Sequence, residues 1–225
     1  GLSALATAGL DTVALRCPAH PVARAVIVAA GVPLAAPSAN MSGTLSTTTP
    51  QHVADSLGAA VDMILAAGPS AIGLESTVLD LTGATPAILR RGAISADDIS
   101  RVIETDVIYD DAPSATPKSP GQLLRHYAPT CPLRLGAVDV RAGEALLGFG
   151  PAQFIKIAGG GTLETLGGAY KNLSVTGDLH EAASNLFAHL RALDQPAHTA
   201  IAVMDIPRTG LGAAIWDRLS RGAGA

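Results

Sequence analysis

Four short stretches of this sequence place hydroxyl, amide and basic side chains beside apolar, strand-like segments. The first is the run Ser38 to Gly43 (SANMSG), which is separated from the apolar segment 32–36 only by Pro37. Small hydroxyls, a carboxamide and a glycine at the carboxyl end of a strand can hydrogen-bond a nucleotide or a phosphate at close range. The same composition is also typical of a polar turn that ends a strand, so this run alone leaves both interpretations open.

The second stretch is Gly73 to Val78 (GLESTV), in which Glu75 precedes two hydroxyl residues at the start of a predicted strand. The Ser76 hydroxyl could donate a hydrogen bond to a carboxylate or polarise a carbonyl group. An edge strand with solvated hydroxyls is the alternative interpretation.

The third stretch places Arg90 directly after the apolar segment 87–89, and Arg16 follows the segment 12–15 in the same way. A guanidinium group at the end of a buried strand presents a planar set of donors that suits a phosphate or a carboxylate. Taken alone, each arginine is equally compatible with an ordinary surface position.

The fourth stretch lies within residues 108–130, which are rich in proline and aspartate and show little periodicity. This segment contains Ser119-Pro120-Gly121 and then Arg125, His126 and Tyr127. A tyrosine there could stack on a base or bond a phosphate, whereas an inert spacer is the alternative. Because the segment is longer than an ordinary connection inside a compact domain, we predict a linker that acts as a lid.

The composition limits the classes of protein to consider. The 225 residues suffice for two small domains, and 48% of them are apolar while only 15% are charged. The net charge of −4 gives no general basic excess that would recruit nucleic acid. Cys17 and Cys131 form no CxxC pair, which predicts reduced thiols. The longest apolar run, 23–30, is too short to cross a bilayer, so we expect no membrane association and a cytoplasmic protein.

The apolar pattern predicts strands that alternate with helices, which is typical of an α/β fold with a mostly parallel sheet. Helices are predicted where caps, prolines and apolar stripes coincide, at 21–30, 50–57, 95–103, 178–193 and 211–221. Strands are predicted at 12–15, 32–36, 63–65, 76–81, 87–89, 153–157, 172–174 and 200–204, and a second α/β unit opens at 132–135.

In their order and spacing, these motifs resemble the Sua5/YrdC/YwlC family, the L-threonylcarbamoyladenylate synthases. The resemblance rests on TVALRCPAHP, APSANMSGTLSTT, GLESTVLDL, ILRRGAI and SPGQLLRHYAP, and it continues through NLSVTGDLHEAASNLFAHLRALD to IPRTGLGAAIWDRLSR. It covers nearly the whole chain. It implies the carboxy-terminal part of a YrdC-like twisted-sheet α/β catalytic domain in residues 1–107, an ordered linker or lid in 108–130, and a small Rossmann-like parallel α/β Sua5 accessory domain in 131–225.

The resemblance implies a nucleotidyltransferase that converts ATP, L-threonine and bicarbonate to threonylcarbamoyl-AMP and pyrophosphate, with Mg²⁺ accompanying the ATP. A separate complex would then modify adenosine 37 of tRNA, so that complex or tRNA itself is an expected downstream partner. No residue is expected to act as a covalent catalyst or a metal ligand, because positioning and charge neutralisation can supply most of the rate. By resemblance, the ATP contacts are Thr12, Asn40, Thr48, Arg90 and Tyr127, and the L-threonine contacts are Arg16, Ser38 and Ser76.

Several positions depart from the family pattern. Arg91 replaces the usual proline, Gln122 stands where methionine is frequent, and Trp216 stands where many members have asparagine. Family members also carry an upstream Lys-Arg…Lys segment that binds the ATP phosphates. Because this sequence starts downstream of that segment's position, the resemblance predicts an amino-terminally truncated enzyme whose 225 residues alone are inactive.

Two other function classes remain as alternatives. YrdC-like folds present a concave and partly basic surface, so a non-catalytic RNA-binding module is one of them, although the acidic balance of this chain weighs against it. A carbamoyltransferase domain like that of hydrogenase maturation proteins is the other. Those proteins carry acylphosphatase and zinc-finger segments, and the accessory domain predicted here weighs against this assignment.

Overall fold

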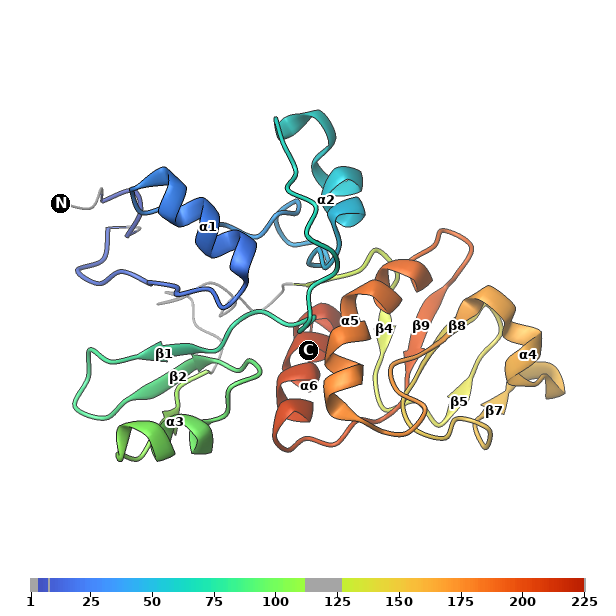
Figure 1. The fold of residues 1–225 in the computed structure, drawn as a ribbon. Helices are drawn as coiled ribbons and strands as arrows, with labels where there is room; N and C mark the ends of the chain where they lie inside the picture. The colour runs from blue at the N-terminus through green and yellow to red at the C-terminus, as the bar shows by residue number, and fades with distance from the viewer. Residues whose placement is uncertain (1–3, 8, 112–126, 225) are drawn as a thin grey trace.

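A computed structural model describes residues 4–7, 9–111 and 127–224 of the chain. The described residues form an N-terminal half and a C-terminal half that lie side by side (Figure 1). Three sheets of three, four and two strands are present among them, accompanied by helices in both halves. The predicted α/β class is therefore confirmed.

The N-terminal half contains the three predicted helices and one small sheet. Helices α1 and α2 each begin with a proline in the first turn, and the Thr49 hydroxyl caps α2 by accepting a hydrogen bond from the His52 amide. Ser95 and Asp98 form a capping box at the start of α3. The elements are α1 (Pro21–Ala30), α2 (Pro50–Leu57), a 3₁₀ turn (Gly58–Ala60), β1 (Val78–Asp80), β2 (Ala87–Arg90), α3 (Ala96–Ile103) and β3 (Ile108–Tyr109).

The sheet of this half has the order β1-β2-β3. Strand β1 runs antiparallel to β2, whereas β3 runs parallel to β2. Residues 108 and 109, at the start of the predicted linker, therefore extend this sheet.

Three predicted strands are absent from the described structure. Segments 12–15, 32–36 and 63–65 run as extended loops, with Leu15 83% and Met63 77% exposed. A strand requires a hydrogen-bonded neighbour, and the described residues provide none for these segments. The apolar pattern of these segments predicts buried strands, but no described strand pairs with them.

The C-terminal half is built on a parallel sheet of order β4-β9-β6-β8. A two-stranded parallel ladder of β5 and β7 lies beside it. The central strand β6 was not predicted, because its apolar core of three residues is too short to stand out from a loop. The elements are β4 (Leu133–Arg134), β5 (Asp139–Val140), β6 (Glu144–Gly148), β7 (Lys156–Ile157), α4 (Leu163–Leu166), β8 (Tyr170–Asn172), α5 (Leu179–Leu193), β9 (Ala200–Val203) and α6 (Leu211–Ala223), with 3₁₀ turns at Ala158–Gly160 and Gly167–Ala169.

The four-stranded sheet is buried on both faces. On β6, Leu147 points into the core with α5 and α6, whereas Leu146 belongs to the smaller cluster on the opposite face. On β9, Ile201 and Ala202 divide between the two faces in the same way. Burial on both faces is the usual environment of a parallel sheet and explains the continuous apolar run of these strands.

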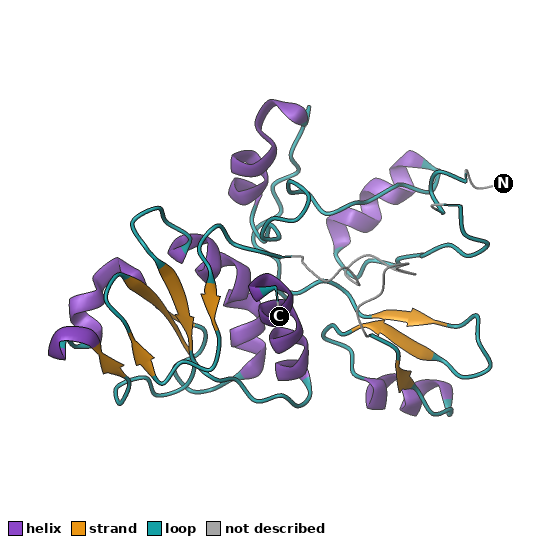
Figure 2. Cartoon of the chain, turned by 180° about the vertical axis from the view of Figure 1, so that it is seen from behind, coloured by secondary structure: helices purple, strands orange, loops and turns teal. Residues whose placement is uncertain are grey.

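The two halves share the core that α5 and α6 cover. Leu45 and Leu74 of the N-terminal half are buried in the same cluster as the α5 and α6 side chains. Figures 1 and 2 show from opposite sides that these two helices lie between the four-stranded sheet and the N-terminal half. Gly73 permits the close approach, because a Cβ atom there would lie 2.3 Å from the Ala183 carbonyl oxygen.

No helix among the described residues is long and apolar enough to cross a membrane.

We predict that Leu147→Ala lowers the free energy of unfolding of the C-terminal half by about 2–5 kcal/mol, because it opens a cavity beside a fully buried strand. Urea denaturation followed by circular dichroism measures the change. The control is Val138→Ala, whose side chain is 82% exposed, and it should change the free energy by no more than about 0.5 kcal/mol. Equal effects of the two substitutions would contradict the assigned core.

Candidate functional site

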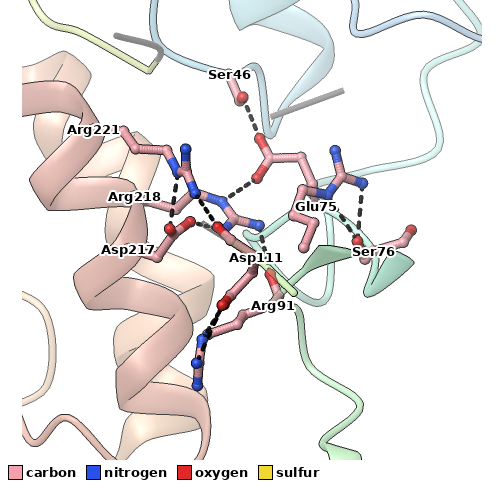
Figure 3. Close-up of polar contacts among 9 residues, drawn as sticks. Ser46, Glu75, Ser76, Arg91, Asp111, Asp217, Arg218 and Arg221 are labelled. Carbon is pink, nitrogen blue, oxygen red and sulfur yellow. Dashed lines mark hydrogen bonds and ion pairs between the residues drawn. The ribbon is translucent and has the colours of Figure 1, made fainter. Parts of the chain in front are cut away.

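The Glu75 carboxylate lies at the centre of a polar cluster between the two halves (Figure 3). One oxygen accepts a hydrogen bond from the Ser46 hydroxyl, and the other accepts from Nε of Arg218 at 2.8 Å. Burial raises the pKa of Glu75, but the positive charge of Arg218 and the two hydrogen bonds outweigh it, so that the net pKa lies below its usual value. Glu75 is therefore ionised at neutral pH.

Arg218 reaches this cluster from α6, and its side chain is fully buried. Besides Glu75, it donates to a carboxylate oxygen of Asp217 at 2.6 Å and to the Arg91 carbonyl oxygen at 2.8 Å. Burial opposes its charge, but Glu75 leads the interactions that overcome this effect and raise the pKa of Arg218. One guanidinium group thus satisfies a side-chain carboxylate and a backbone carbonyl of the N-terminal half at the same time.

Arg90 and Ser76 lie together at the neighbouring ends of β1 and β2. Nε and Nη2 of Arg90 donate to the Ser76 carbonyl oxygen at 3.0 and 2.9 Å, and the arginine is only 7% exposed. Burial lowers the pKa of Arg90, an effect that the Tyr127 hydroxyl opposes through a hydrogen bond. The guanidinium still stays cationic at any physiological pH. Arg90, the predicted phosphate contact, therefore holds the backbone of Ser76, a predicted threonine contact.

Tyr127 is the first described residue after position 111, and it is 2% exposed. Its backbone has φ of 59°, a left-handed conformation that is uncommon for an aromatic residue. Its ring lies 5.8 Å from the Phe187 ring of α5, and the Arg218 guanidinium carbon lies 5.2 Å from the Tyr127 ring centroid. Burial raises the pKa of the Tyr127 hydroxyl. Tyr127 thus lies in one cluster with Arg90 and Arg218, next to the Ser76 carbonyl oxygen that Arg90 binds.

The loop from residue 38 to residue 48 passes close to this cluster. The Asn40 side-chain amide donates to the Met41 and Thr44 carbonyl oxygens at 3.0 and 3.1 Å, while its Oδ1 atom is buried without a partner among the described residues. Thr48 is buried, and its hydroxyl lies 3.3 Å from Nδ1 of His52. Ser38 is exposed. Asn40 therefore has one acceptor that no described residue occupies, whereas Thr48 is engaged within the loop.

Two further hydrogen-bonding arrangements connect the loop to the rest of the cluster. The Gly43 carbonyl oxygen accepts from the Ala128 amide at 3.1 Å, so the loop is bonded to the residue after Tyr127. Arg191 of α5 donates to the carbonyl oxygens of Leu45 and Ser46. The loop is thus held by the C-terminal half as well as by its own turns.

Thr12 and Arg16 lie apart from these contacts. Both are exposed in the extended segment before α1, and within the described chain neither has a hydrogen bond or an ion pair. The described structure therefore does not bring them to the cluster, and their roles stay predictions. The linker residues Lys118, Ser119, Gln122 and Arg125 lie outside the described residues.

Sequence reasoning missed the polar residues of α6. Asp217 bonds both Arg218 and Arg221, and Arg221 donates to the Asp111 carbonyl oxygen at 3.0 Å. The available signal was the run Asp217 to Arg221 (DRLSR), which places one acid and two arginines on the turns of an otherwise apolar helix.

The structure also accounts for two departures from the family pattern. Arg91 forms an ion pair with Asp111, and its guanidinium carbon lies 3.8 Å from the Tyr109 ring centroid. Trp216 stacks under Arg208, whose guanidinium carbon is 4.0 Å from the ring centroid. Each unusual side chain therefore has a local partner.

Comparison with protein families gives two matches that meet near residue 93. Residues 1–92 match the model described as Telomere recombination, whose members include the Sua5, YciO and YrdC proteins. Residues 94–224 match the model described as Threonylcarbamoyl-AMP synthase, C-terminal domain.

Curated relatives agree with these matches. The chain is 38% identical to the threonylcarbamoyl-AMP synthase of Bacillus subtilis and 34% identical to that of Pyrococcus abyssi, and it covers 66% of each. These alignments include 99% and 97% of the chain. The chain thus spans slightly less than two thirds of the length of these relatives.

A solved structure has the same fold. The crystal structure of P. abyssi Sua5 complexed with L-threonine matches with a TM-score of 0.81 and 30% identity. The match covers 99% of this chain and 67% of that one.

We predict that Glu75→Gln destabilises the protein in a pH-dependent way. The folded-state pKa of Glu75 is lowered, so its stabilising effect is complete above the unfolded value of 4.5 and is lost as the pH falls through the folded-state value. The difference in urea midpoint between the wild type and the variant should be largest at about pH 7 and shrink below about pH 4.5. Glu164→Gln, at an exposed position of α4, is the control. A pH-independent difference would contradict the assigned ion pair.

Proposed function

This chain belongs to the Sua5/YrdC/YwlC family, and from that membership we propose that the complete protein containing it is a threonylcarbamoyl-AMP synthase. It would form threonylcarbamoyl-AMP and pyrophosphate from ATP, L-threonine and bicarbonate. The observation that carries the proposal is the convergence of Arg90, Ser76 and Tyr127 on one buried cluster beside the loop that holds Asn40. The similarity to a Sua5 structure that contains L-threonine supports it.

The chemistry needs positioning more than a reactive side chain. An oxygen of the threonine carbamate would attack the α-phosphorus of ATP, which forms an oxygen–phosphorus bond and breaks the bond to the departing pyrophosphate. Negative charge accumulates around phosphorus, and a preorganised guanidinium stabilises it without reorganisation. Arg90 suits this task because its orientation is already fixed by the Ser76 carbonyl oxygen.

The remaining predicted contacts divide between the two substrates. Asn40 has a buried acceptor, Oδ1, that is not bonded by any described residue and suits a hydrogen-bond donor of the nucleotide. Ser76 and Ser38 are exposed hydroxyl residues suited to the threonine side, where Arg16 would supply the positive charge for its carboxylate. Thr12, Thr48 and Tyr127 complete the proposed nucleotide contacts.

Mg²⁺ would enter this site with the nucleotide. Within the described ranges, no group of three His, Cys, Asp or Glu side chains is placed to hold a metal ion. Mg²⁺ commonly keeps several waters and binds through substrate phosphates, so ATP would supply its main ligands. We further propose that the protein acts in the cytoplasm and that its product passes to a tRNA-modifying complex.

We predict that the complete protein releases pyrophosphate from ATP only when L-threonine and bicarbonate are both present. A coupled pyrophosphate assay with each substrate omitted in turn measures this dependence. Release that persists without threonine would show that ATP is consumed in a different reaction.

We predict that Ser76→Ala affects mainly threonine, whereas Arg90→Ala affects ATP and, because it releases the Ser76 carbonyl oxygen, threonine as well. Loss of one neutral hydrogen bond should raise the KM for threonine roughly 3- to 10-fold in Ser76→Ala, with little change in the KM for ATP. Loss of a charged donor should lower kcat/KM for ATP roughly 10- to 100-fold in Arg90→Ala. The control is Thr105→Ala, whose hydroxyl is exposed beyond α3. Equal effects of Ser76→Ala on both substrates would contradict the assignment.

A further inference from the structure

The polar residues of α6 contact the N-terminal half at positions adjacent to the proposed ligand residues. Arg218 bonds the side chain of Glu75, which immediately precedes Ser76. It also bonds the carbonyl oxygen of Arg91, which immediately follows Arg90. A single side chain of the C-terminal half therefore contacts both strand-end segments on which the threonine and phosphate contacts depend (Figure 3).

The same guanidinium group reaches two more parts of the proposed site. Its central carbon lies over the Tyr127 ring, 5.2 Å from the ring centroid. Through Glu75 it is connected to Ser46, which lies in the loop between Asn40 and Thr48. All four segments that carry described members of the proposed cluster thus meet at Arg218 or at its partner carboxylate.

The buried charges of Arg218 and Glu75 oppose any movement of the two side chains apart. Arg218 has no exposed side-chain surface, and Glu75 keeps only 16% of its own. Removing either partner would leave the other as a poorly compensated buried charge, which is strongly unfavourable. Asp217 adds the second carboxylate and fixes the guanidinium plane. Together with Ser46 and Arg90 of the N-terminal half, α6 therefore holds the positions of Glu75 and the adjoining Ser76 backbone.

We infer that Arg218 is a positioning residue for the proposed reaction, so that the C-terminal domain completes the binding site of the N-terminal domain. Arg218 would touch neither substrate. It would act through Glu75 on the Ser76 backbone, through the Arg91 carbonyl on Arg90, and through the contact of its guanidinium with the ring of Tyr127. The inference deepens the proposed function and rests on it for the identity of the substrates.

The test compares Arg218→Met with the double variant Glu75→Gln/Arg218→Met in the complete protein. Methionine keeps the length of the side chain but removes its charge, and the glutamine removes the carboxylate that would otherwise be left unpaired. Arg208→Ala is the control, because Arg208 lies in the same domain, is 62% exposed and contacts Trp216 instead of the cluster.

The first measurement is hydrogen–deuterium exchange, which needs no substrate. In Arg218→Met we expect faster exchange in peptides covering 73–78 and 88–93, while β6 and β9 keep their protection. Unchanged exchange in 73–78 and 88–93 would overturn the inference. If Arg218→Met also loses protection in β6 and β9, the double variant decides the question. Slow exchange of segment 73–78 in the double variant would show that Arg218 is dispensable and would overturn the inference. Fast exchange confined to 73–78 and 88–93 in the double variant would support it.

The second measurement is steady-state pyrophosphate release. We expect Arg218→Met to lower kcat/KM roughly tenfold or more, mainly through higher KM values for threonine and ATP, as expected from the loss of charged hydrogen bonds. The double variant, which still lacks Arg218, should stay similarly impaired, and Arg208→Ala should stay within about twofold of the wild type. Unchanged KM values in Arg218→Met would overturn the inference. If the wild type shows no threonine-dependent release, the proposed function fails, and the exchange measurement still decides the role of Arg218.

Discussion

The ion pair between Glu75 and Arg218 is the interaction on which the arrangement of the two halves depends. It joins the segment before β1 to the last helix, and both partners are withdrawn from solvent. Buried charges of this kind are tolerated only when every partner is in place, so the contact selects one relative position of α6 and the N-terminal sheet. Gly73 allows the same segment to lie directly on the α5 backbone.

The two halves contribute differently to this arrangement. The C-terminal half has a parallel sheet covered on both faces, and its core strands are fully buried. The N-terminal half has a three-stranded sheet and many exposed apolar side chains, and it adds Leu45 and Leu74 to the core under α5 and α6. The well-buried C-terminal half therefore supports the loops of the proposed site.

Within the cluster, backbone groups are bonded by side chains of distant segments. Arg90 holds the Ser76 carbonyl oxygen, Arg218 holds that of Arg91, and Arg191 holds those of Leu45 and Ser46. Arginine suits this role because its planar donors can satisfy several acceptors in one fixed geometry. These hydrogen bonds hold the loops in place without a dense hydrophobic core around them. The proposed site can therefore stay open to small charged substrates.

The sequence by itself determined the family, the α/β class and the helices, because prolines, capping residues and apolar stripes are local signals that need no distant partner. Its motifs also predicted Arg90, Ser76 and Tyr127 as ligand contacts, and the structure places these residues near one another. Only the tertiary structure decided which apolar segments became strands, since β6 is paired on both sides while segment 12–15 has no neighbour among the described residues. The run DRLSR marks Arg218 as a charged residue on an apolar helix, but only the structure shows its partner, because Glu75 lies 143 positions away in the sequence.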